Sequence, residues 1–478
     1  MAVRIKLSSI PKESHEEIMR DLIVTPIDVQ LETMKKRGQI SGYVPKTDTS
    51  FSVYHIETRN LGQGPIKYIR VPYRYAQERF KRNNDHLDHR EIPGIPDLVK
   101  YKATLRDTPT QGNDKSQVEI AIDCLKQLDS TGGTIIGLPP GSGKTYIGSW
   151  LAYHLGLMTI ALAPRSTLIA SWYTTFSTAM PDAKIWVVGE NDSDFNYNPR
   201  DLDSQYDMGI PDIIICLDPR VEKIPEFIRE MIGTMIIDEA HMLATPSRVK
   251  ALLSIFPRYV ILETATLIRD DGLHEICHLI AGSDGIFEVA KVPYTVYDVQ
   301  LPFIQVKEIQ GAMGVSYPAL CSALAEHELY NAVIVGIIKN NLDRKFIVLT
   351  RLIEHGKLLK KLLIEEGIEC DTFMGNQKSY KDSHVLIGTF SKIGVGFDEA
   401  TACKDFKGRK SDSIIMAHSV KKPSNFEQFR GRVMRVADPI VYWLTPNHRM
   451  IKSHLRDLRA HIASTSGVIE VVDGMEFI

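Results

Sequence analysis

Short apolar runs alternate with longer segments of helical periodicity over most of this chain, and that alternation constrains its fold more than any other feature. From Ser116 on, runs such as GTIIGL, TIALAP and DIIICL are separated by helix-like segments. A short apolar run bounded by turn residues fits a strand that is buried on both faces of a parallel sheet. A second series, with KFIVLT, HVLIGTF and SIIMAH, follows Pro293. We therefore predict an α/β protein with two doubly wound parallel-sheet lobes, residues 113–292 and 293–478.

The N-terminal part of the chain follows a different pattern. The strand-like pieces FSVYHIE and IKYIRVPY stand among charged stretches, which predicts a small α+β module over residues 1–112. The segment RYAQERFKRNNDHLDHREIPGIPD is polar and contains two prolines, so we interpret it as a linker or an exposed edge. Residues 73–82, YRYAQERFKR, interleave aromatic and basic side chains, which suits either an accessory nucleic-acid contact or an amphipathic helix that faces solvent.

The charge balance and the cysteines limit the class of protein. The chain holds 57 Lys and Arg against 59 Asp and Glu, which argues against a generally basic coat for nucleic acid but leaves a local groove or backbone contacts open. Six cysteines form no C-x-x-C pair, which favours reduced thiols over disulfides or zinc. The start lacks the apolar core of a signal peptide, and AVIVGII is too short to span a bilayer. We expect a soluble intracellular protein, cytoplasmic or nuclear.

The stretch GTIIGLPPGSGKTYIGSW carries the first candidate site. A strand, a glycine-rich turn and a helix follow one another, as in a phosphate-binding loop. The glycines let backbone N–H groups form an anion nest, the lysine neutralises the β- and γ-phosphates of ATP, and the threonine binds Mg²⁺. The predicted contacts are Gly141, Ser142, Gly143, Lys144 and Thr145.

One position departs from the phosphate-loop template. The template asks for glycine where this chain has Leu138, but Leu138 ends the strand before the nest, so we expect it not to disturb binding. The alternative is an ordinary glycine turn with a chance G-K-T, which the strand-loop-helix setting disfavours.

Two acids end a later apolar strand, in GTMIIDEAHML. Metal-dependent phosphoryl transfer needs a carboxylate near Mg²⁺ and a group that orients or polarises the attacking water. Asp238 is the candidate for the metal shell and Glu239 for the water. A solvated Asp-Glu pair at a helix start is the ordinary alternative, and the position of the pair after GSGKT argues against it.

GSGKT followed by DEAH resembles the superfamily 2 helicases of the DEAH/DExH type, which are RecA-like two-lobe motors. The resemblance implies two RecA-like lobes and ATP hydrolysis with Mg²⁺. ALAPRSTLIASW is similar to the family motif that touches the nucleic-acid backbone, which implies contacts from Arg165, Ser166 and Thr167. LETATLI resembles the Ser-Ala-Thr coupling motif, so the implied coupling residues are Thr264 and Thr266, together with His241 of DEAH.

The second series of strands continues the resemblance. VLIGTFSKIGVGFDEA resembles the motif in which Thr389 meets the nucleic-acid strand, while Gly394, Gly396 and Asp398 lie near the lobe interface, with Asp398 on the nucleotide side. NFEQFRGRVMR matches the family motif Q-x-x-G-R-x-x-R, and the implied catalytic residues are Gln428, Arg432 and Arg435.

A glutamine upstream of the phosphate loop completes the set. Gln117 stands where the family often has the glutamine that reads adenine, and Gln111 is the rival candidate.

The arginines of FRGRVMR also suggest a mechanism. A guanidinium is permanently charged and presents a rigid fork of donors, which suits a γ-phosphate. Arg432 and Arg435 lie three positions apart, so a helix would place them on one face. We expect ATP on the first lobe to draw this face in as an arginine finger, and hydrolysis to release it. A solvated basic helix is the alternative.

These motifs predict an ATP-dependent helicase or translocase that separates strands or moves along nucleic acid, with DNA favoured over RNA. A nucleic-acid-stimulated ATPase that remodels nucleoprotein complexes without unwinding, for example in transcript release, stays open. Another P-loop NTPase is disfavoured because no N/T-K-x-D motif is placed after DEAH as guanine recognition requires. An inactive binding module is disfavoured because Lys144, Asp238, Glu239 and Arg435 are all present.

Partners and surroundings are expected from the same resemblance. Nucleic acid is the main partner, the N-terminal module is a candidate to bind a protein, and no membrane contact is expected. The combination of a DEAH motif, a compact second lobe and an unusual N-terminal module also resembles helicases of large DNA viruses and phages. A viral protein that is packaged in a virion is therefore an open alternative. Trp172, Tyr173 and Phe390 stand near the motif loops and suit either base stacking or core packing.

Overall fold

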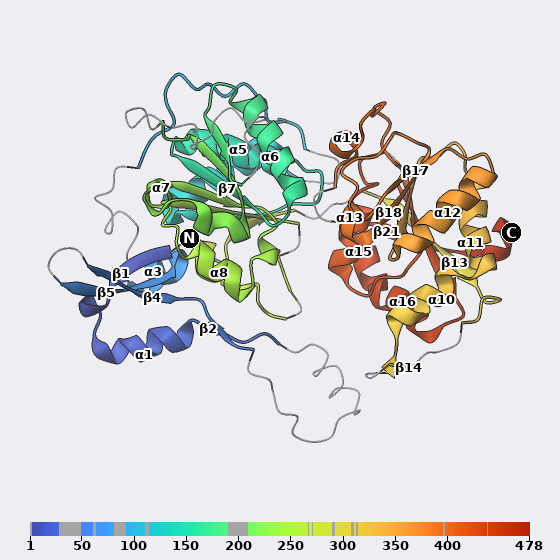
Figure 1. The fold of residues 1–478 in the computed structure, drawn as a ribbon, viewed down its shortest axis with the longest axis horizontal. Coiled ribbons are helices and arrows are strands. Elements are labelled where there is room, and N and C mark those ends of the chain that lie inside the picture. Colours follow the sequence, from blue (N-terminus) through green and yellow to red (C-terminus); the bar gives the residue numbers. More distant parts are fainter. Residues whose placement is uncertain are drawn as a thin grey trace. The chain divides into compact units, whose positions relative to one another are not determined.

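The computed structural model of the chain forms two compact units (Figure 1). The first comprises residues 1–110, 114–138 and 142–288, and the second comprises residues 289–478 together with 111–113 and 139–141. The structure describes residues 2–27, 49–60, 64–80, 92–109, 114–189, 209–265, 267–269, 271–288, 292–306, 310–311, 314–394, 397–436 and 438–478.

A seven-stranded parallel sheet forms the centre of the first unit. Its strands, from edge to edge, are β12 (Gly285–Phe287), β6 (Gly133–Gly137), β11 (Tyr259–Thr264), β10 (Thr234–Ile237), β7 (Thr159–Ala163), β9 (Ile213–Leu217) and β8 (Ile185–Val187). All residues of β6, β7 and β10 are buried, as expected for strands covered on both faces. Ile160 and Leu162 enter one hydrophobic core, whereas Ala161 and Ala163 enter the other.

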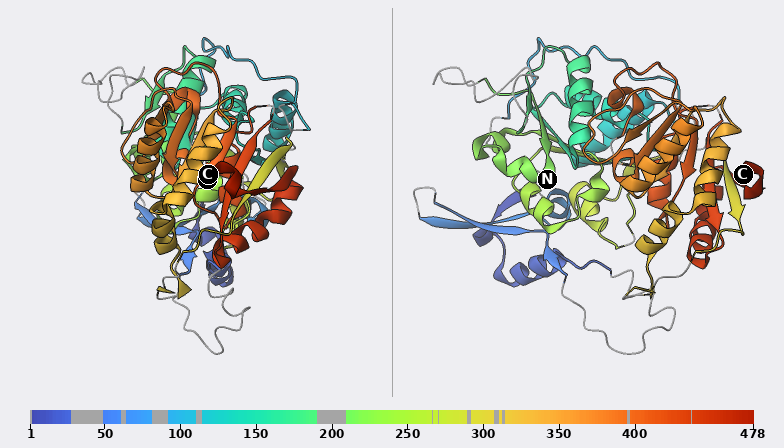
Figure 2. Two further views of the ribbon diagram at one scale, coloured as in Figure 1. Left: turned by 90° about the vertical axis from the view of Figure 1, so that its right-hand side faces the viewer. Right: turned by 45° about the vertical axis from the view of Figure 1, so that its right-hand side comes forward.

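Helices cover both faces of this sheet, as two further views confirm (Figure 2). One face carries α4 (Gln117–Thr131), α5 (Lys144–Leu155) and α6 (Ser166–Ala179), and the other carries α7 (Glu226–Met231), α8 (Pro246–Leu252) and α9 (Glu275–Ala281). Because parallel strands end at the same edge of a sheet, the loops after β6, β10 and β11 come together there.

The helix α4 buries one face against the sheet and leaves the other partly open to solvent, with Ile122 42% exposed. The helix begins with a capping box in which Ser116 Oγ accepts from the Glu119 backbone, and this start fixes Gln117 at its first turn. The face that packs inward carries Gln117, Ile120, Ala121, Cys124 and Leu128.

A second seven-stranded parallel sheet organises the second unit. Its strands, from edge to edge, are β17 (Cys370–Phe373), β18 (Val385–Thr389), β16 (Phe346–Thr350), β19 (Ser413–Met416), β20 (Ile440–Pro446), β13 (Tyr294–Leu301) and β21 (Gly467–Asp473). The helices α10 (Tyr317–Ala325), α11 (Glu328–Lys339) and α12 (Ile353–Glu365) pack into one core, and α13 (Phe390–Ile393), α14 (Glu399–Ala402), α15 (Pro423–Arg430) and most of α16 (Arg449–Ser464) line the other face. A short hairpin pairs β14 (Gln310–Gly311) with β15 (Gly314–Val315).

The predicted fold class is therefore confirmed: two RecA-like, doubly wound parallel-sheet lobes with a small N-terminal α+β module. Two strands of the second sheet were not anticipated. In β13 apolar positions are interrupted by Thr295 and Asp298, and β21 is an edge strand that leaves Val468 and Val471 exposed. Neither sequence has the unbroken apolar run of a central strand.

The N-terminal module contains an antiparallel three-stranded sheet in the order β1 (Ala2–Lys6), β5 (Pro65–Pro72), β4 (His55–Asn60). The helices α1 (Lys12–Asp21) and α3 (Tyr73–Phe80) and the pair β2 (Ile23–Val24) and β3 (Phe51–Ser52) accompany it. The module packs on the rest of the first unit through Arg4, which forms an ion pair with Glu230 (3.0 Å) and places its guanidinium 4.2 Å from the centre of the Phe256 ring. Residues 92–109 also join this unit, because Val99 and Leu105 enter its core.

Protein contacts occupy the side chains of α3. Tyr73 and Ala76 are buried, and the helix packs against α9. Tyr75 donates to Asp21 (3.0 Å), and Arg74 forms an ion pair with Glu78 (2.8 Å). The helix therefore supports the fold rather than lying free in solvent, while positions 81 and 82 of the basic-aromatic stretch lie outside the described residues.

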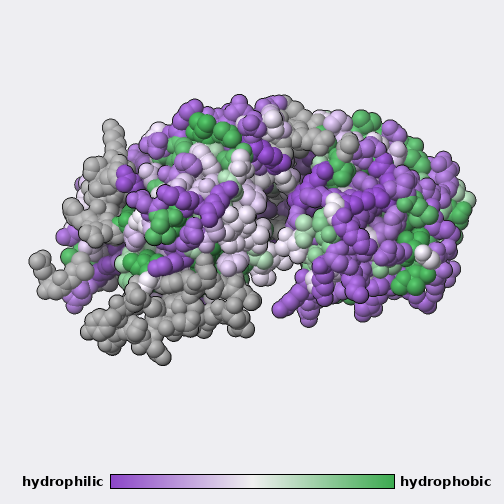
Figure 3. All heavy atoms as spheres, turned by 90° about the horizontal axis from the view of Figure 1, so that it is seen from above, coloured by the Kyte–Doolittle hydropathy of each residue, from purple (hydrophilic) through white to green (hydrophobic). Residues whose placement is uncertain are grey.

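Hydrophilic side chains cover most of the face drawn in Figure 3, with smaller hydrophobic patches between them. Among the described residues, no helix is both long enough and apolar enough to cross a membrane.

Candidate nucleotide and nucleic-acid site

The predicted phosphate loop lies between β6 and α5. Gly141 and Gly143 adopt left-handed backbone conformations, with φ values of 85° and 82°. A side chain at Gly143 would also collide with a neighbour, because a Cβ there would lie 2.2 Å from Gln117 Nε2. Glycine is therefore required at Gly143 both for its conformation and for space.

Leu138, where the chain departs from the phosphate-loop template, is held by the core and by hydrogen bonds of its backbone. Its side chain is fully buried in the core beneath α4–α6. Its backbone N–H donates to the Thr264 carbonyl (3.1 Å), and its carbonyl accepts from Lys144 Nζ (3.0 Å). The residue thus anchors the end of the strand and orients the lysine, and neither contact depends on a glycine at this position.

Gln117 lies at this loop. Its Oε1 accepts from the Arg106 backbone N–H (2.9 Å), and its Nε2 donates to the Ser142 carbonyl (2.9 Å). Gln111 lies outside the described residues. Arg106 was missed by sequence reasoning, because it follows a short irregular stretch with no periodic pattern that distinguishes it.

The carboxylate of Asp238 is held at the carboxyl end of β10. Its Oδ2 accepts from the indole N–H of Trp172 (3.0 Å), and its Oδ1 accepts from the Glu239 backbone N–H (2.8 Å). Burial raises the pKa of Asp238 and the charge of Glu239 raises it further, whereas Lys144 and the Trp172 hydrogen bond lower it. Asp238, Glu239 and Lys144 therefore share one electrostatic environment.

Glu239 is held in a strained conformation beside His241. Its φ of 47° places a non-glycine residue in the left-handed region, an arrangement that clusters at functional sites. Its Oε2 lies 3.4 Å from His241 Nδ1, and the same nitrogen lies 3.0 Å from Thr264 Oγ1. The structure thus brings together two of the predicted coupling residues, His241 and Thr264. Thr266 lies outside the described residues.

His241 is held neutral by its surroundings. Burial, followed by the positive charges of Arg269, Lys144 and Arg165, lowers the pKa of His241 to about 4. The effect of Arg165 shows that the start of α6, the DEAH segment and the end of β11 lie close enough to interact. A neutral imidazole can accept from or donate to Thr264, which suits a link between sites.

Sequence reasoning missed an acid at this site, Glu263. It lies in β11 directly before Thr264 and is fully buried, and neither carboxylate oxygen has a hydrogen-bond partner among the described residues. Gly148 of α5 makes room for it, because a Cβ there would lie 2.4 Å from Glu263 Oε1. Burial, then the charge of Asp238, raise the pKa of Glu263 well above its ordinary value. The sequence feature that could have revealed Glu263 is its position as a single acid inside the apolar run YVILET.

The predicted nucleic-acid contacts of the first unit lie at the start of α6. Arg165 is the residue before the first turn and is half-buried. Ser166 and Thr167 are exposed, as contacts to a backbone require. Trp172, by contrast, is fully buried and hydrogen-bonded to Asp238, which confirms core packing over base stacking for this residue.

In the second unit, the predicted residues interact with one another. Arg435 forms an ion pair with Asp398, which lowers the pKa of that carboxyl despite its burial, and Asp398 also caps α14 by accepting from the Ala400 backbone (2.9 Å). Arg432 donates to the backbone carbonyls of Gly394 and Phe397. The loop that follows β18 is therefore tied to the arginine motif.

The shared helical face expected for the arginines is wrong. The helix α15 ends at Arg430, and Arg432 and Arg435 lie in the turns that follow it. Arg430 is the buried arginine of the motif, with an ion pair to Glu427 and its guanidinium 4.5 Å from the Tyr294 ring. Arg430 therefore stabilises the fold from the last turn of α15. The two predicted finger residues, Arg432 and Arg435, lie beyond the end of that helix.

The other predicted residues of this unit lie along the same strand-loop-helix region. Thr389 ends β18, is buried, and lies 3.2 Å from Ser391 through their hydroxyls. Gln428 is half-buried on α15. Phe390 packs on Phe429 with ring centres 4.7 Å apart, which favours packing over base stacking. Gly396 lies outside the described residues.

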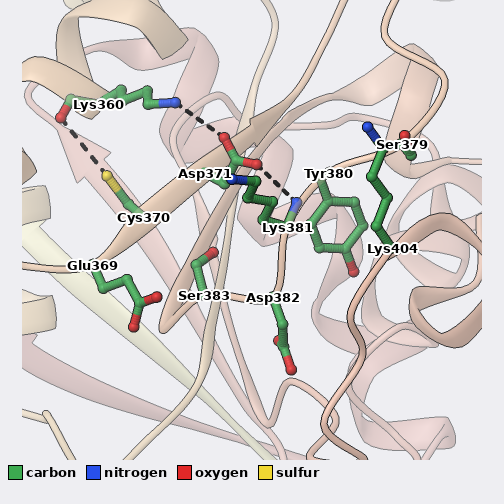
Figure 4. A pocket seen from close by; sticks show the side chains of 10 residues that line it. All are labelled: Lys360, Glu369, Cys370, Asp371, Ser379, Tyr380, Lys381, Asp382, Ser383 and Lys404. Carbon is green, nitrogen blue, oxygen red and sulfur yellow. Dashed lines mark hydrogen bonds and ion pairs between the residues drawn. The ribbon is translucent and has the colours of Figure 1, made fainter.

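A hollow of about 430 Å³ on the second unit shares none of these residues (Figure 4). It lies where β17 and β18 begin, whereas Thr389 lies at the other end of β18. Asp371 is satisfied there by Lys360 (3.0 Å) and by the Lys381 backbone (2.8 Å). Its acids and lysines balance one another; the lining residues are Lys360, Glu369, Cys370, Asp371, Ser379, Tyr380, Lys381, Asp382, Ser383 and Lys404.

The residues of the first site fit ATP and Mg²⁺. Gly141 and Gly143 take left-handed conformations of the kind found in anion nests, and Lys144 supplies a cation at the same loop. Glu239 Oε2 and both Glu263 oxygens are buried without a hydrogen-bond partner among the described residues. Buried carboxylate oxygens of this kind require a partner, and oxygen ligands are those that Mg²⁺ prefers.

Comparison with known proteins finds helicases. The profile described as "Type III restriction enzyme, res subunit" matches residues 112–269. The helicase-named protein 161L of Invertebrate iridescent virus 6 is 28% identical over 404 residues, which cover 78% of this chain and 84% of that protein. These similarities support a superfamily 2 helicase. The helicase-named protein D10 of Escherichia phage T5 is 24% identical and covers 82% of this chain and 84% of its own length.

A solved structure supports the fold of this chain. A variant of S. cerevisiae Dbp5 bound to RNA and ADP BeF3 superposes with a TM-score of 0.52 at 14% identity, over 75% of this chain and 90% of that chain. The similarity to helicase-named proteins supports nucleotide binding, nucleic-acid binding and an NTPase activity of the helicase type. The resemblance to viral and phage helicases is confirmed.

Proposed function

We propose that this helicase hydrolyses ATP to separate strands of nucleic acid or to move along them, with DNA as its track. The observation that carries the proposal is the environment shared by Lys144, Asp238 and Glu239 at the carboxyl edge of the first sheet. Phosphate loop, lysine and paired acids are what phosphoryl transfer from a nucleotide requires.

Residues of the first unit divide the work at the nucleotide. Backbone N–H groups of the loop, with Ser142, bind the phosphates, and Lys144 compensates their charge. Thr145 and Asp238 hold Mg²⁺, which supplies electrostatic stabilisation of the phosphates. Gln117, fixed by Arg106 and Ser142, presents its amide to the base. Glu239, with an oxygen free of hydrogen bonds, orients the attacking water.

Residues of the second unit act once nucleotide is bound. Arg435 and Arg432, assisted by Gln428, stabilise charge on the transferring phosphoryl group, and Asp398 holds Arg435 in place until then. His241 and Thr264 pass the state of the nucleotide to the nucleic-acid contacts, with Thr266 next to them in sequence. Arg165, Ser166, Thr167 and Thr389 hold the strand by its backbone, so binding is independent of base sequence.

The domain roles follow the same scheme. Residues 113–292 form the ATP-binding lobe, residues 293–478 form the C-terminal helicase lobe, and residues 1–112 serve as an accessory module that binds a protein partner. Because Arg4 of the module contacts Glu230 and Phe256, a partner bound to the module would lie beside the ATP-binding lobe.

ATP hydrolysis by the purified protein tests this function. We expect turnover to rise on addition of single-stranded, duplex or branched DNA, more strongly at low than at moderate salt, because phosphate contacts release counterions. Strand displacement on the stimulating substrate then separates unwinding from translocation. Stimulation by RNA alone would reassign the track. Stimulation without strand displacement would favour the remodelling ATPase, and hydrolysis that ignores every nucleic acid would contradict the proposal.

A further inference from the structure

A buried hydrogen bond links the helix of the nucleic-acid motif to the carboxylate of the nucleotide site. The indole N–H of Trp172, on α6, donates to Asp238 Oδ2 at 3.0 Å, and the two residues are 66 positions apart in the chain. Trp172 is fully buried and Asp238 is 6% exposed. A hydrogen bond to an ionised group is stronger than one between neutral groups, and burial keeps water from replacing it.

Neighbouring side chains hold the indole ring in one position. The ring centre of Phe176 lies 5.3 Å away, one turn further along α6. On the other side the ring reaches under α5, where a Cβ added at Gly148 would lie 3.1 Å from it. Closely packed interiors leave little room for a ring to adjust alone, so Trp172 moves only when α6 moves.

The start of α6 carries the proposed nucleic-acid contacts. Ser166 and Thr167 form its exposed first turn, and Arg165 precedes them. Trp172 follows Arg165 by seven residues, about 10 Å along a helix axis. Because the helix is continuous over Ser166–Ala179, a shift at its first turn changes the distance from the indole to Asp238. Hydrogen bonds weaken steeply with distance and angle, so a small shift has a large effect.

We propose that Trp172 is a positioning residue of the ATPase, which fixes the carboxylate of Asp238 and transmits strand binding at α6 to the nucleotide site. The inference rests on the proposed function. It differs from the contact between His241 and Thr264, because it runs through the body of α6 and reaches the proposed metal carboxylate rather than Glu239.

Another tryptophan provides a matched control. Trp443 in the second unit is fully buried, and its indole nitrogen has no hydrogen-bond partner among the described residues. Trp172→Phe and Trp443→Phe therefore remove similar ring volume from a packed core, and only the first removes a hydrogen bond. Replacing Trp172 with benzothienylalanine, which keeps the ring shape and lacks the N–H, serves as a second variant if Trp172→Phe does not fold.

Two readouts test the inference. The first is ATP hydrolysis with and without single-stranded DNA. The second is the Mg²⁺ concentration at which a non-hydrolysable ATP analogue raises the thermal midpoint. We expect the loss of the N–H at position 172 to reduce the stimulation and to raise the required Mg²⁺, each about tenfold, as the loss of a charge-assisted hydrogen bond implies. Trp443→Phe should match the wild type in both.

The possible results distinguish a failure of the role of Trp172 from a failure of the proposed function. If position-172 variants that fold behave as Trp443→Phe does in both readouts, the positioning role of Trp172 is overturned. If the Mg²⁺ requirement rises while DNA stimulation is kept, Trp172 holds Asp238 but the transmission through α6 is overturned. If the wild type hydrolyses ATP with no response to any nucleic acid, the proposed function fails, and the Mg²⁺ readout alone then decides whether Trp172 positions Asp238.

Discussion

The two units hold their functional charges in opposite ways. In the first unit, Glu239 and Glu263 keep buried oxygens without a hydrogen-bond partner in the described structure, and Asp238 lies beside them. In the second unit, Arg435 is paired with Asp398, and Arg432 donates to two carbonyls of its own loop. Unpartnered buried groups destabilise a fold, whereas paired groups do not. The first site therefore holds buried acids that lack a partner in the described structure, whereas the arginines of the second unit are held by their own loop.

The largest expected effect removes the cation of the first site. Lys144→Ala should abolish ATP hydrolysis, with turnover reduced at least about a thousandfold, because the phosphate charge and the transition state lose their main compensating cation. Steady-state hydrolysis assays measure the change. Lys126→Ala, which alters an exposed lysine on α4 in a salt bridge with Asp123, is the control and should behave as wild type. Full activity in Lys144→Ala would refute the site.

Arginines of the second unit give the next contrast. Arg435→Ala should reduce kcat about a hundredfold while ATP affinity changes little, because the side chain is paired within its own unit until the transition state. Arg430→Ala should instead lower the free energy of unfolding by about 3 kcal/mol, since it leaves Glu427 partly unpaired in the interior. Kinetics and thermal unfolding of both variants separate the two. An Arg435→Ala protein that loses ATP affinity and keeps its turnover would contradict the finger role.

The pH dependence of the free energy of unfolding distinguishes Asp218 of the first unit from Asp398 of the second, because their pKa values are shifted in opposite directions. Burial raises the pKa of Asp218 in the first unit to about 6, although Arg248 opposes it, so the folded state takes up a proton that the unfolded state has lost. The protonation of Asp218 therefore adds to the free energy of unfolding, on the order of 2 kcal/mol. This stabilisation is present below about pH 4 and is lost as pH rises to about 6. Asp218→Asn should remove this decline.

Asp398 has the opposite sign and is the control for that experiment. Its pKa is lowered in the second unit, so its contribution is present above its ordinary pKa and is lost only as pH falls further. Thermal midpoints measured from pH 4 to 7 for wild type, Asp218→Asn and Asp398→Asn decide the matter. If Asp218→Asn follows the wild-type curve over this range, the burial cost assigned to Asp218 is wrong.

The smallest expected effect is a change in stability on replacement of Glu263, whose buried carboxylate has no hydrogen-bond partner among the described residues. Glu263→Met keeps the volume and removes a buried carboxyl, so it should raise the free energy of unfolding by about 1 kcal/mol in the absence of ligand. The same change should slow ATP hydrolysis, since residues kept at a cost to stability are commonly functional. Denaturant unfolding and turnover are measured together. A variant that is less stable than wild type, or equally active, would remove Glu263 from the site.

The central strands and the glycine loop were predictable because short stretches of sequence determine them. The apolar runs gave the central strands, and the glycine loop before Lys144 was recognisable because its binding groups lie within five consecutive residues. The end of α15 carries no such local signal, because Gly431 keeps a right-handed helical conformation, with a φ of −55°, and not the left-handed one by which glycine commonly ends a helix. The expected helical face of Arg432 and Arg435 failed because their spacing does not show where the helix ends.

Contacts between distant segments were not predictable in the same way. The hydrogen bond from Trp172 to Asp238, the room that Gly148 makes for Glu263, and the contact of Arg106 with Gln117 depend on how helices pack on the sheet. A single sequence does not specify that packing.

Calorimetric titration of the full chain with a non-hydrolysable ATP analogue, with and without Mg²⁺, tests most directly the claim that the first unit is completed by nucleotide. We predict binding that Mg²⁺ strengthens in the wild type and that Lys144→Ala loses, with Arg435→Ala retaining it. No Mg²⁺-dependent binding by the wild type, or equal binding by Lys144→Ala, would contradict the account.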